Sequence, residues 1–337
     1  MIAVPAPSIN LQKQQGFVLV LTLWVLVIVA IAAGYFAERV ARSVELAQQS
    51  KQNTRAMIDI AGTRAELLYR LGTTSLSLYG LGQSGAAIEL NNQIYHGVGG
   101  TFLRLQDNRG LLNLNIVDDD RLQRLLGLLG IPAEQRGHLI DTLRDYTDAD
   151  NLHRLNGAEV EEYLARNLPP PANSNLLTPW EARRIIGWRD APQLGQTGRL
   201  AELTTTLSFG VNPNTAPAEV LATLPGVTEE IAQAIIAQRK ISPIMHEAHL
   251  AKIVPVSAQQ LADIIITFPD KSLRITQSAH GLPWAIQYNI TLTPNSDVAP
   301  WRTDYYSRVS TDGRDETQTN IPELPPRSTT LPENAPD

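Results

Sequence analysis

The sequence predicts an α+β protein in which a long N-terminal helix packs on a small antiparallel sheet and a large helical block interrupts that sheet. Three observations indicate this: an apolar run near the N-terminus, strand-like alternation on both sides of the middle of the chain, and helical spacing with turn signals between them. The chain has 337 residues, a formal net charge of −6 and no cysteine. The missing cysteine excludes disulfides, thiolate metal sites and a cysteine nucleophile. The acidic balance argues against a nucleic-acid partner.

The apolar run covers residues 17–37 and is broken only by Thr22 and Gly34. A helix of this length is about long enough to cross the ~30 Å hydrocarbon core of a bilayer. Helical spacing then continues to about residue 71. The sequence therefore predicts one transmembrane and stem helix over residues 17–72.

A glycine precedes the apolar run, whereas the residues that follow it continue as helix and offer no small-residue cleavage site. Residues 1–16 therefore resemble a type IV pilin-like leader, which a prepilin peptidase cuts after glycine before it methylates the new N-terminus. An uncleaved signal anchor fits the hydrophobicity equally well. On the leader interpretation, Gly16 is the last leader residue and Phe17 the first mature one. Leu21 then occupies the fifth mature position, where major pilins carry a glutamate.

Strand-like alternation flanks the helical block. Residues 101–106 alternate after a loop rich in Gly, Ser and Asn, and later runs at 272–277, 284–292 and 305–309 also suit strands. The expected boundaries are a loop and first strand over 73–110, a helical insert over 111–270, C-terminal strands over 271–310 and a disordered tail over 311–337.

The helical block contains an internal repeat, with copies at about residues 111–160 and 205–265. Leu112-Asn113-Leu114-Asn115 begins one copy and Val211-Asn212-Pro213-Asn214 the other, and each leads into a helix and a glycine turn. An asparagine before a helix caps free N–H groups, and glycine permits positive φ. The repeat therefore needs no functional explanation.

The second copy also resembles the helix-hairpin-helix module of competence-type DNA receptors, which makes a membrane-anchored DNA receptor the alternative function. Its hairpin departs from that module at Thr228, where a glycine is usual, and at Glu229 and Glu230, which would repel a phosphate. Residues 111–270 hold 13 Lys and Arg against 20 Asp and Glu, a formal charge of −7. No nucleic-acid partner is therefore expected.

An acidic stretch within the first copy is the candidate metal site. If Asp148 is position one, acids fall at positions one, three and twelve and a backbone carbonyl at five, which are ligand positions of a calcium loop. The candidate ligands are Asp145, Asp148, Asp150, the carbonyl of Leu152, and Glu159. Position six is His153 rather than glycine, so the loop is not an EF-hand. Clustered carboxylates suit a hard cation such as calcium, and the alternative is a solvated acidic loop that caps the next helix.

In chain order, these features resemble the minor pseudopilin K family of the type II secretion system across roughly residues 12–310. The resemblance rests on Gly16-Phe17 with a fifth residue other than Glu, Leu112 to Asn115, Asp145 to Asp150 near Gly157-Ala158-Glu159, Pro170 to Glu181, and Val211 to Ala216. It implies a pilin-like sheet, an insert with two SAM-like, helix-hairpin-helix-like subdomains, and bound calcium. The leader is longer than usual, and Tyr146 stands where the family commonly has tryptophan.

The resemblance also implies a role. The family forms the tip of the periplasmic pseudopilus with minor pseudopilins I and J, and this pseudopilus helps to export folded proteins across the outer membrane. The major pseudopilin and the inner-membrane secretion platform are further expected partners, as are the exported proteins. We expect a single-pass inner-membrane protein with its C-terminal domain in the periplasm. No catalytic constellation is recognisable in the sequence, so we expect no enzyme.

Overall fold

The structure is a computed structural model that describes residues 15–195, 199–311 and 319–326. Its chain divides into two compact units, residues 1–57 and residues 58–337. Residues 1–14 of the expected leader lie outside the described residues. The described chain begins with Gln15 and Gly16, the first two residues of helix α1.

Helix α1 runs from Gln15 to Thr73, against the 17–72 expected from the sequence. In the first unit its apolar side chains are exposed all round, as Phe17 at 70% and Leu21 at 53% illustrate. A helix that is apolar on every face is stable in lipid, because the backbone satisfies its own hydrogen bonds. Within the described residues this is the one helix long and apolar enough to cross a membrane.

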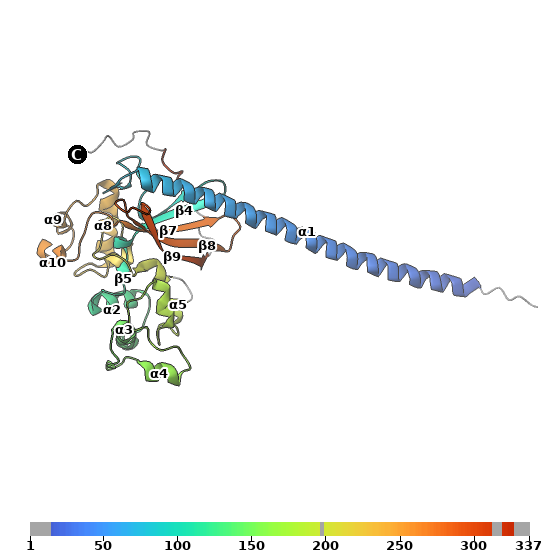
Figure 1. Cartoon of the computed structure of the whole chain (residues 1–337), viewed down its shortest axis with the longest axis horizontal. Helices are drawn as coiled ribbons and strands as arrows, with labels where there is room; N and C mark the ends of the chain where they lie inside the picture. The colour runs from blue at the N-terminus through green and yellow to red at the C-terminus, as the bar shows by residue number, and fades with distance from the viewer. Residues whose placement is uncertain (1–14, 196–198, 312–318, 327–337) are drawn as a thin grey trace, which may run out of the picture. The chain divides into compact units, whose positions relative to one another are not determined.

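The second unit is built on a five-stranded antiparallel sheet, which confirms the predicted α+β fold (Figure 1). The strand order is β3-β4-β7-β8-β9. The strands are β3 (Asn91–His96), β4 (Thr101–Asp107), β7 (Ser272–Ala279), β8 (Trp284–Leu292) and β9 (Trp301–Ser310). The chain leaves the sheet at Asp107 and returns beside it, because Asp107 pairs with Leu273 across β4 and β7.

The C-terminal part of α1, from residue 58 on, packs on this sheet. Ile60, Leu67 and Leu71 are buried there, and their spacings of seven and four residues give the helix one apolar stripe. The Thr63 and Thr101 hydroxyls form a buried hydrogen bond of 2.7 Å. The Arg64 guanidinium lies 5.0 Å from the centre of the Tyr288 ring. Helix and sheet therefore share one core.

Two regions differ from the sequence prediction. The segment before residue 101, which was expected to be a loop, contains β3 and a two-stranded hairpin, β1 (Leu76–Ser77) and β2 (Gly80–Leu81). Part of the tail expected to be disordered is also placed on the sheet: the His96 N–H donates to the Pro322 carbonyl at 2.9 Å. Residues 319–326 thus cover the outer edge of β3, whereas residues 312–318 and 327–337 of that tail lie outside the described residues.

The insert between β4 and β7 is mostly helical. Its elements are η1 (Asn108–Gly110), β5 (Leu112–Asn113), α2 (Asp119–Leu128), α3 (Ala133–Thr147), α4 (Val160–Ala165), η2 (Pro179–Arg184), α5 (Pro192–Gly195), α6 (Arg199–Leu203), β6 (Thr204–Thr205), α7 (Ala218–Leu221), α8 (Glu229–Ile241), α9 (Glu247–Leu250) and α10 (Ala258–Ala262). Figure 1 shows α2 to α5 and α8 to α10 as two separate groups. Both groups contribute to one apolar cluster, which includes Leu122 and Ile235.

The two copies of the repeat use the same hydrogen bonds. The Asn113 side chain accepts from the Asn115 N–H at 2.9 Å, and the Asn212 side chain accepts from the Asn214 N–H at 3.0 Å. Before α2 the first motif forms strand β5, paired in parallel with β6, rather than leading directly into a helix. These asparagines bend the backbone at the start of each copy. The prediction that they cap a helix is wrong, because the N-cap residues are Asp118 for α2 and Pro217 for α7.

Asp107 holds the joint between the sheet and the insert. Its buried carboxylate accepts from the Asn212 side chain at 2.9 Å, the Thr215 hydroxyl at 2.8 Å, and the Arg109 and Asp270 N–H groups at 3.0 Å each. Burial raises the pKa of this carboxyl, and the hydrogen bonds oppose that shift. The joint thus ties the end of β4, the start of the second copy and the exit of the insert to one group.

Candidate functional site

The acidic loop predicted from the sequence lies between helices α3 and α4. Asp145 sits in the last turn of α3 and is fully buried, and Glu159 is the N-cap residue of α4. Asp148, Asp150 and Leu152 lie in the connection between these two helices. A carboxylate near a helix C-terminus is disfavoured by the helix dipole, so Asp145 needs compensation from other groups.

Asp145 finds part of that compensation in the backbone of its own loop. It accepts from the Arg154 N–H, at 3.2 Å to Oδ2 and 3.4 Å to Oδ1, and the Arg154 Nε lies 3.8 Å from Oδ1. Burial nevertheless raises the pKa of Asp145. The loop approaches the carboxylate so closely that a Cβ at Gly157 would lie 1.8 Å from Oδ2. A larger residue at this point would have to displace the buried Asp145 carboxylate.

Glu159 has a buried carboxylate without a hydrogen-bond partner, which is the strongest indication of a ligand at the site. Its side chain is 5% exposed, and neither carboxylate oxygen has a hydrogen-bond partner. The Glu159 N–H donates to the Glu162 carboxylate at 2.9 Å in a capping arrangement, but its own carboxylate stays unpaired within ordinary hydrogen-bond limits. Burial first, and then the charges of Asp145, Asp148 and Asp150, raise the pKa of Glu159 to about 7. The charges of the other acids around this carboxylate therefore outweigh the opposing charge of His153.

Asp148 and Asp150, the remaining predicted acidic ligands, also interact electrostatically with the other acids. Burial, followed by the charges of Asp150 and Asp145, raises the pKa of Asp148, and its Oδ1 is buried without a hydrogen bond. Asp150 Oδ1 accepts from the Leu152 N–H at 2.8 Å, which bends the loop at this point. The structure thus brings the predicted acids into electrostatic contact.

These residues fit a hard cation. Buried carboxylate oxygens without donors are costly, and oxygen ligands of this kind suit calcium. Among the described residues, however, no group of three or more His, Cys, Asp or Glu side chains is already arranged to hold a metal ion. The acidic side chains are close enough to shift one another's pKa, but they do not point at one common position, so acids alone do not form the site.

Two residues beside the acids were not expected from the sequence. Arg154 pairs with Asp145, and Asn173, which follows α4, reaches back to the loop through its side chain. Arg154 belongs to the acidic stretch itself, so its charge was a signal that could have been used. Asn173 lies in a proline-rich connection without periodicity, and no sequence pattern points to it.

The residues predicted for processing and assembly lie in the first unit. Gly16 and Phe17 fall within the first turn of α1, and Leu21 lies one turn further along the same helix. The Phe17 and Leu21 side chains are exposed. The processing and assembly roles of these residues remain predictions.

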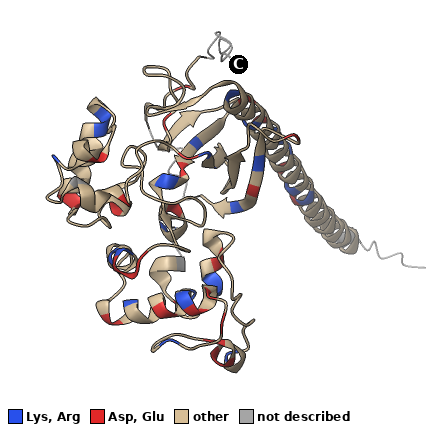
Figure 2. Cartoon of the chain, turned by 60° about the vertical axis from the view of Figure 1, so that its left-hand side comes forward, with Lys and Arg blue, Asp and Glu red and all other residues tan. Residues whose placement is uncertain are grey.

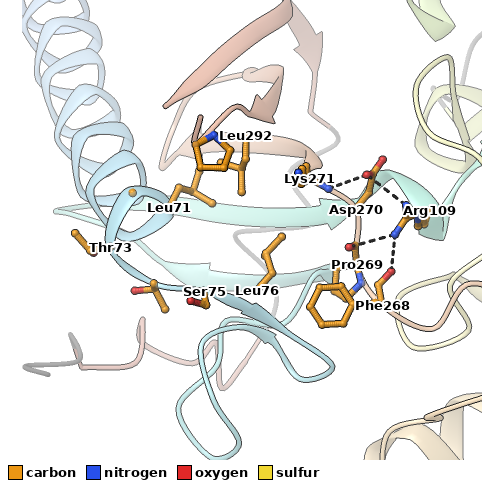
Figure 3. A pocket seen from close by; sticks show the side chains of 13 residues that line it. Leu71, Thr73, Ser75, Leu76, Arg109, Phe268, Pro269, Asp270, Lys271 and Leu292 are labelled. Atoms are coloured by element: carbon orange, nitrogen blue, oxygen red, sulfur yellow. Dashed lines mark hydrogen bonds and ion pairs between the residues drawn. The ribbon is translucent and has the colours of Figure 1, made fainter. Parts of the chain in front are cut away.

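A pocket of about 680 Å³ lies at the joint between the sheet and the insert (Figure 3). Apolar side chains, among them Leu71, Leu76 and Phe268, form much of its lining. At one rim Arg109 donates to the Phe268 carbonyl at 3.0 Å and lies 3.7 Å from Asp270. Arg109 and Asp270 thus offset each other's charge at this rim, and Lys271 also lines the pocket.

The helix-hairpin-helix motif of the second copy is not suited to a phosphate. Gly226 makes the turn with φ +70, and Glu229 and Glu230 form the first turn of α8. Arg239 on this helix donates to the carbonyls of Pro213 and Ala216, so it is already engaged. Figure 2 shows acidic residues interspersed with basic ones on the helices of the insert. The DNA-receptor alternative is not favoured.

Comparisons with known proteins agree with this arrangement. Two models described as type II secretion system protein K match residues 106–194 and 211–254, the two parts that hold the repeat copies. A search of curated proteins gave no match.

Among solved structures, the fold is similar to a chain of the GspK-GspI-GspJ complex from the type 2 secretion system of enterotoxigenic Escherichia coli. The TM-score is 0.54 at 17% identity, covering 78% of this chain and 99% of that one. At this identity the similarity shows the fold alone. The two family matches, on segments that carry the predicted motifs, support the predicted resemblance of this chain to protein K of the type II secretion system, the minor pseudopilin K family.

Proposed function

We propose that this chain is the tip subunit of a periplasmic pseudopilus and acts in the export of folded proteins across the outer membrane. The observation that carries the proposal is the joint at Asp107. A helical block of 160 residues, 111–270, leaves and re-enters the sheet between neighbouring strands, so it extends one end of the pilin-like unit. A block of this size would crowd lateral neighbours in a repeating filament.

The N-terminal helix supports the same position. Leu21 offers no carboxylate to the N-terminal amine of a subunit ahead of it, so the chain belongs where nothing sits ahead. We place α1 in the inner membrane as a single span, with the second unit in the periplasm. On this proposal a prepilin peptidase cuts after Gly16 and methylates Phe17, and the intact mass of the purified protein tests that cut.

Minor pseudopilins I and J are the proposed partners. The likeness to a chain of the GspK-GspI-GspJ complex supports this choice, and the major pseudopilin and the inner-membrane platform are the wider assembly. The chain acts as a structural component and not as an enzyme. Exported proteins are a further class of partner that a tip subunit would meet.

Calcium is the proposed cofactor, held by Asp145, Asp148, Asp150, the Leu152 carbonyl and Glu159. The buried and unpartnered carboxylate of Glu159 supports this proposal. Bound calcium would neutralise the acidic loop and so stabilise the connection between α3 and α4. Its role here is to hold the fold and not to take part in a reaction.

Immunogold labelling of assembled pseudopili tests the tip position. An antibody to residues 111–270 is expected to label filament ends only, while an antibody to the major pseudopilin labels the whole length. The purified full chain in detergent is also expected to retain pseudopilins I and J on an affinity column. Label at regular intervals along the filament would contradict tip placement, and so would failure to retain either partner.

A further inference from the structure

Oxygen atoms without hydrogen-bond donors are concentrated around the acidic loop. Among the described residues, the buried side-chain oxygens without a partner are Asp148 Oδ1, Glu159 Oε1 and Oε2, Asn173 Oδ1 and Gln287 Oε1. Only the last of these belongs to the sheet, in strand β8. A buried oxygen without a donor destabilises the folded chain, so their concentration in one place needs a common explanation.

Asn173 is the member of this group that is not an acid. Its Nδ2 donates to the Asp150 carbonyl at 2.9 Å and to Asn151 Oδ1 at 3.0 Å. Both hydrogens of the amide are therefore engaged by the acidic loop, which fixes the plane of the amide group. The amide oxygen is held in place with no donor of its own.

The donors of the loop are used elsewhere. The N–H groups of Leu152, Arg154 and Asn156 donate hydrogen bonds to the carboxylates of Asp150, Asp145 and Asp141, respectively. The unpartnered oxygens of Asp148, Glu159 and Asn173 can all accept, and a cation is a partner that several of them could share. Calcium takes six to eight oxygen ligands and accepts neutral amide oxygens beside carboxylates.

We propose that Asn173 is a further ligand of the cation, and that its amide closes the acidic loop from the segment that follows α4. This inference rests on the proposed calcium site. It also explains why the acids gather without converging, since a neutral oxygen from another segment completes the set. Binding would then tie residues 148–159 to the connection between α4 and η2.

The backbone at Asn173 determines which variants are informative. Its φ is 45, in the left-handed region, which glycine and aspartate tolerate and alanine does not. Asn173→Gly removes the ligand and both donors without strain. Asn173→Asp keeps an oxygen but loses the donors. Asn167→Gly is a matched control, because Asn167 is exposed and also left-handed, with φ 55.

Calcium titration of the full chain in detergent micelles, followed by calorimetry, separates the possibilities. Asn173→Gly is expected to weaken calcium binding about tenfold or more, and Asn173→Asp to bind at least as tightly as the natural chain. Asn167→Gly is expected to leave the affinity unchanged. If Asn173→Asp loses as much affinity as Asn173→Gly, the residue acts only as a hydrogen-bond donor and the inference is wrong.

Terbium provides a direct count of ligands. The buried Tyr146 ring in the last turn of α3 can sensitise terbium luminescence, and lifetimes in H₂O and D₂O report the number of bound waters. Asn173→Gly is expected to add one bound water and Asn173→Asp to add none. An unchanged water count in Asn173→Gly overturns the inference alone, whereas absence of calcium and terbium binding in the natural chain overturns the calcium site as well.

Discussion

The two copies of the repeat share one set of asparagine hydrogen bonds, made by Asn115 and Asn214 and called the frame below, but differ in the length of chain that these bonds enclose. In the first copy the Asn115 side chain donates to the Leu176 carbonyl at 3.0 Å and accepts from the Leu176 N–H at 2.9 Å. In the second copy Asn214 makes the same pair of bonds with Ile244, at 2.9 and 2.8 Å. Each asparagine thus closes its copy with one donor and one acceptor.

The distance along the chain between these partners is the difference. Asn115 and Leu176 are 61 residues apart and Asn214 and Ile244 are 30 apart, so the first copy holds 31 more residues between its partners. Most of these lie after α3, where the chain runs through the acidic loop, α4 and the Asn173 segment before Leu176. In the second copy α8 ends at Ile241, three residues before Ile244. The asparagine hydrogen bonds common to both copies are therefore structural, and the segment that holds the candidate site is an addition found only in the first copy.

The largest effect is expected from variants that remove the asparagine hydrogen bonds of the frame. Asn115→Ala and Asn214→Ala each leave a backbone N–H and a carbonyl without their partner, which should cost about 2–4 kcal/mol of unfolding free energy. Denaturant unfolding of the full chain in detergent measures this loss. Asn115→Ala should also weaken calcium binding, because Leu176 anchors the Asn173 segment, whereas Asn214→Ala should not. Equal loss of calcium affinity in both variants would contradict the proposal that only the first copy holds the cation.

The frame was easier to predict from the sequence than the addition. The Asn-x-Asn motifs, the apolar run and the alternating strands at 272–292 have local periods or spacings, which sequence patterns record. Strand β3 was missed because Asn91, Asn92 and Gln93 read as a loop, and Asn92 does adopt a positive φ of 67 at the irregularity in its pairing with β4. An edge strand of this kind is set by its neighbour and not by its own propensity.

The candidate site could be predicted only as far as the acids are local. Asp145, Asp148, Asp150 and Glu159 lie within one turn-and-loop segment, so their density was visible. The contact of Asn173 with Asp150 spans 23 residues and depends on the path of a proline-rich connection. The cover of β3 by residues 319–326 joins even more distant parts of the chain. Contacts of this kind follow from tertiary packing and leave no pattern in the sequence.

Calcium removal is the next largest expected effect, and it sharpens the comparison because it should act on one copy. Free calcium at 100 times its dissociation constant stabilises the folded chain by about 2.7 kcal/mol. Chelation by EDTA should therefore lower the melting temperature of the full chain in detergent, by roughly 5–10 °C. Magnesium at the same concentration is the control, since it demands a smaller octahedral site.

Hydrogen exchange shows where this stability resides. On chelation, amides in residues 133–178 should lose protection, whereas amides in residues 211–265 should keep theirs. Loss of protection that is equal in both copies would mean that the cation holds the whole insert and not the addition. An unchanged melting temperature together with no heat of calcium binding would leave the loop as a merely acidic surface.

A further expected effect is a pH dependence confined to the first copy. Glu159 has a pKa of about 7 in the folded chain against 4.5 in the unfolded chain, so the folded state holds its proton more tightly. Its contribution to stability is therefore greatest below pH 4.5 and is lost as the pH rises to about 7. In EDTA the melting temperature of Glu159→Gln should fall less over this window than that of the natural chain. With calcium present the order reverses, because the cation needs the deprotonated carboxylate: the natural chain gains stability towards pH 7, and Glu159→Gln gains little. Parallel melting curves for the two proteins in EDTA would show that the carboxylates of the first copy are as well solvated as the rest of the surface, which would remove the physical reason for placing a cation there.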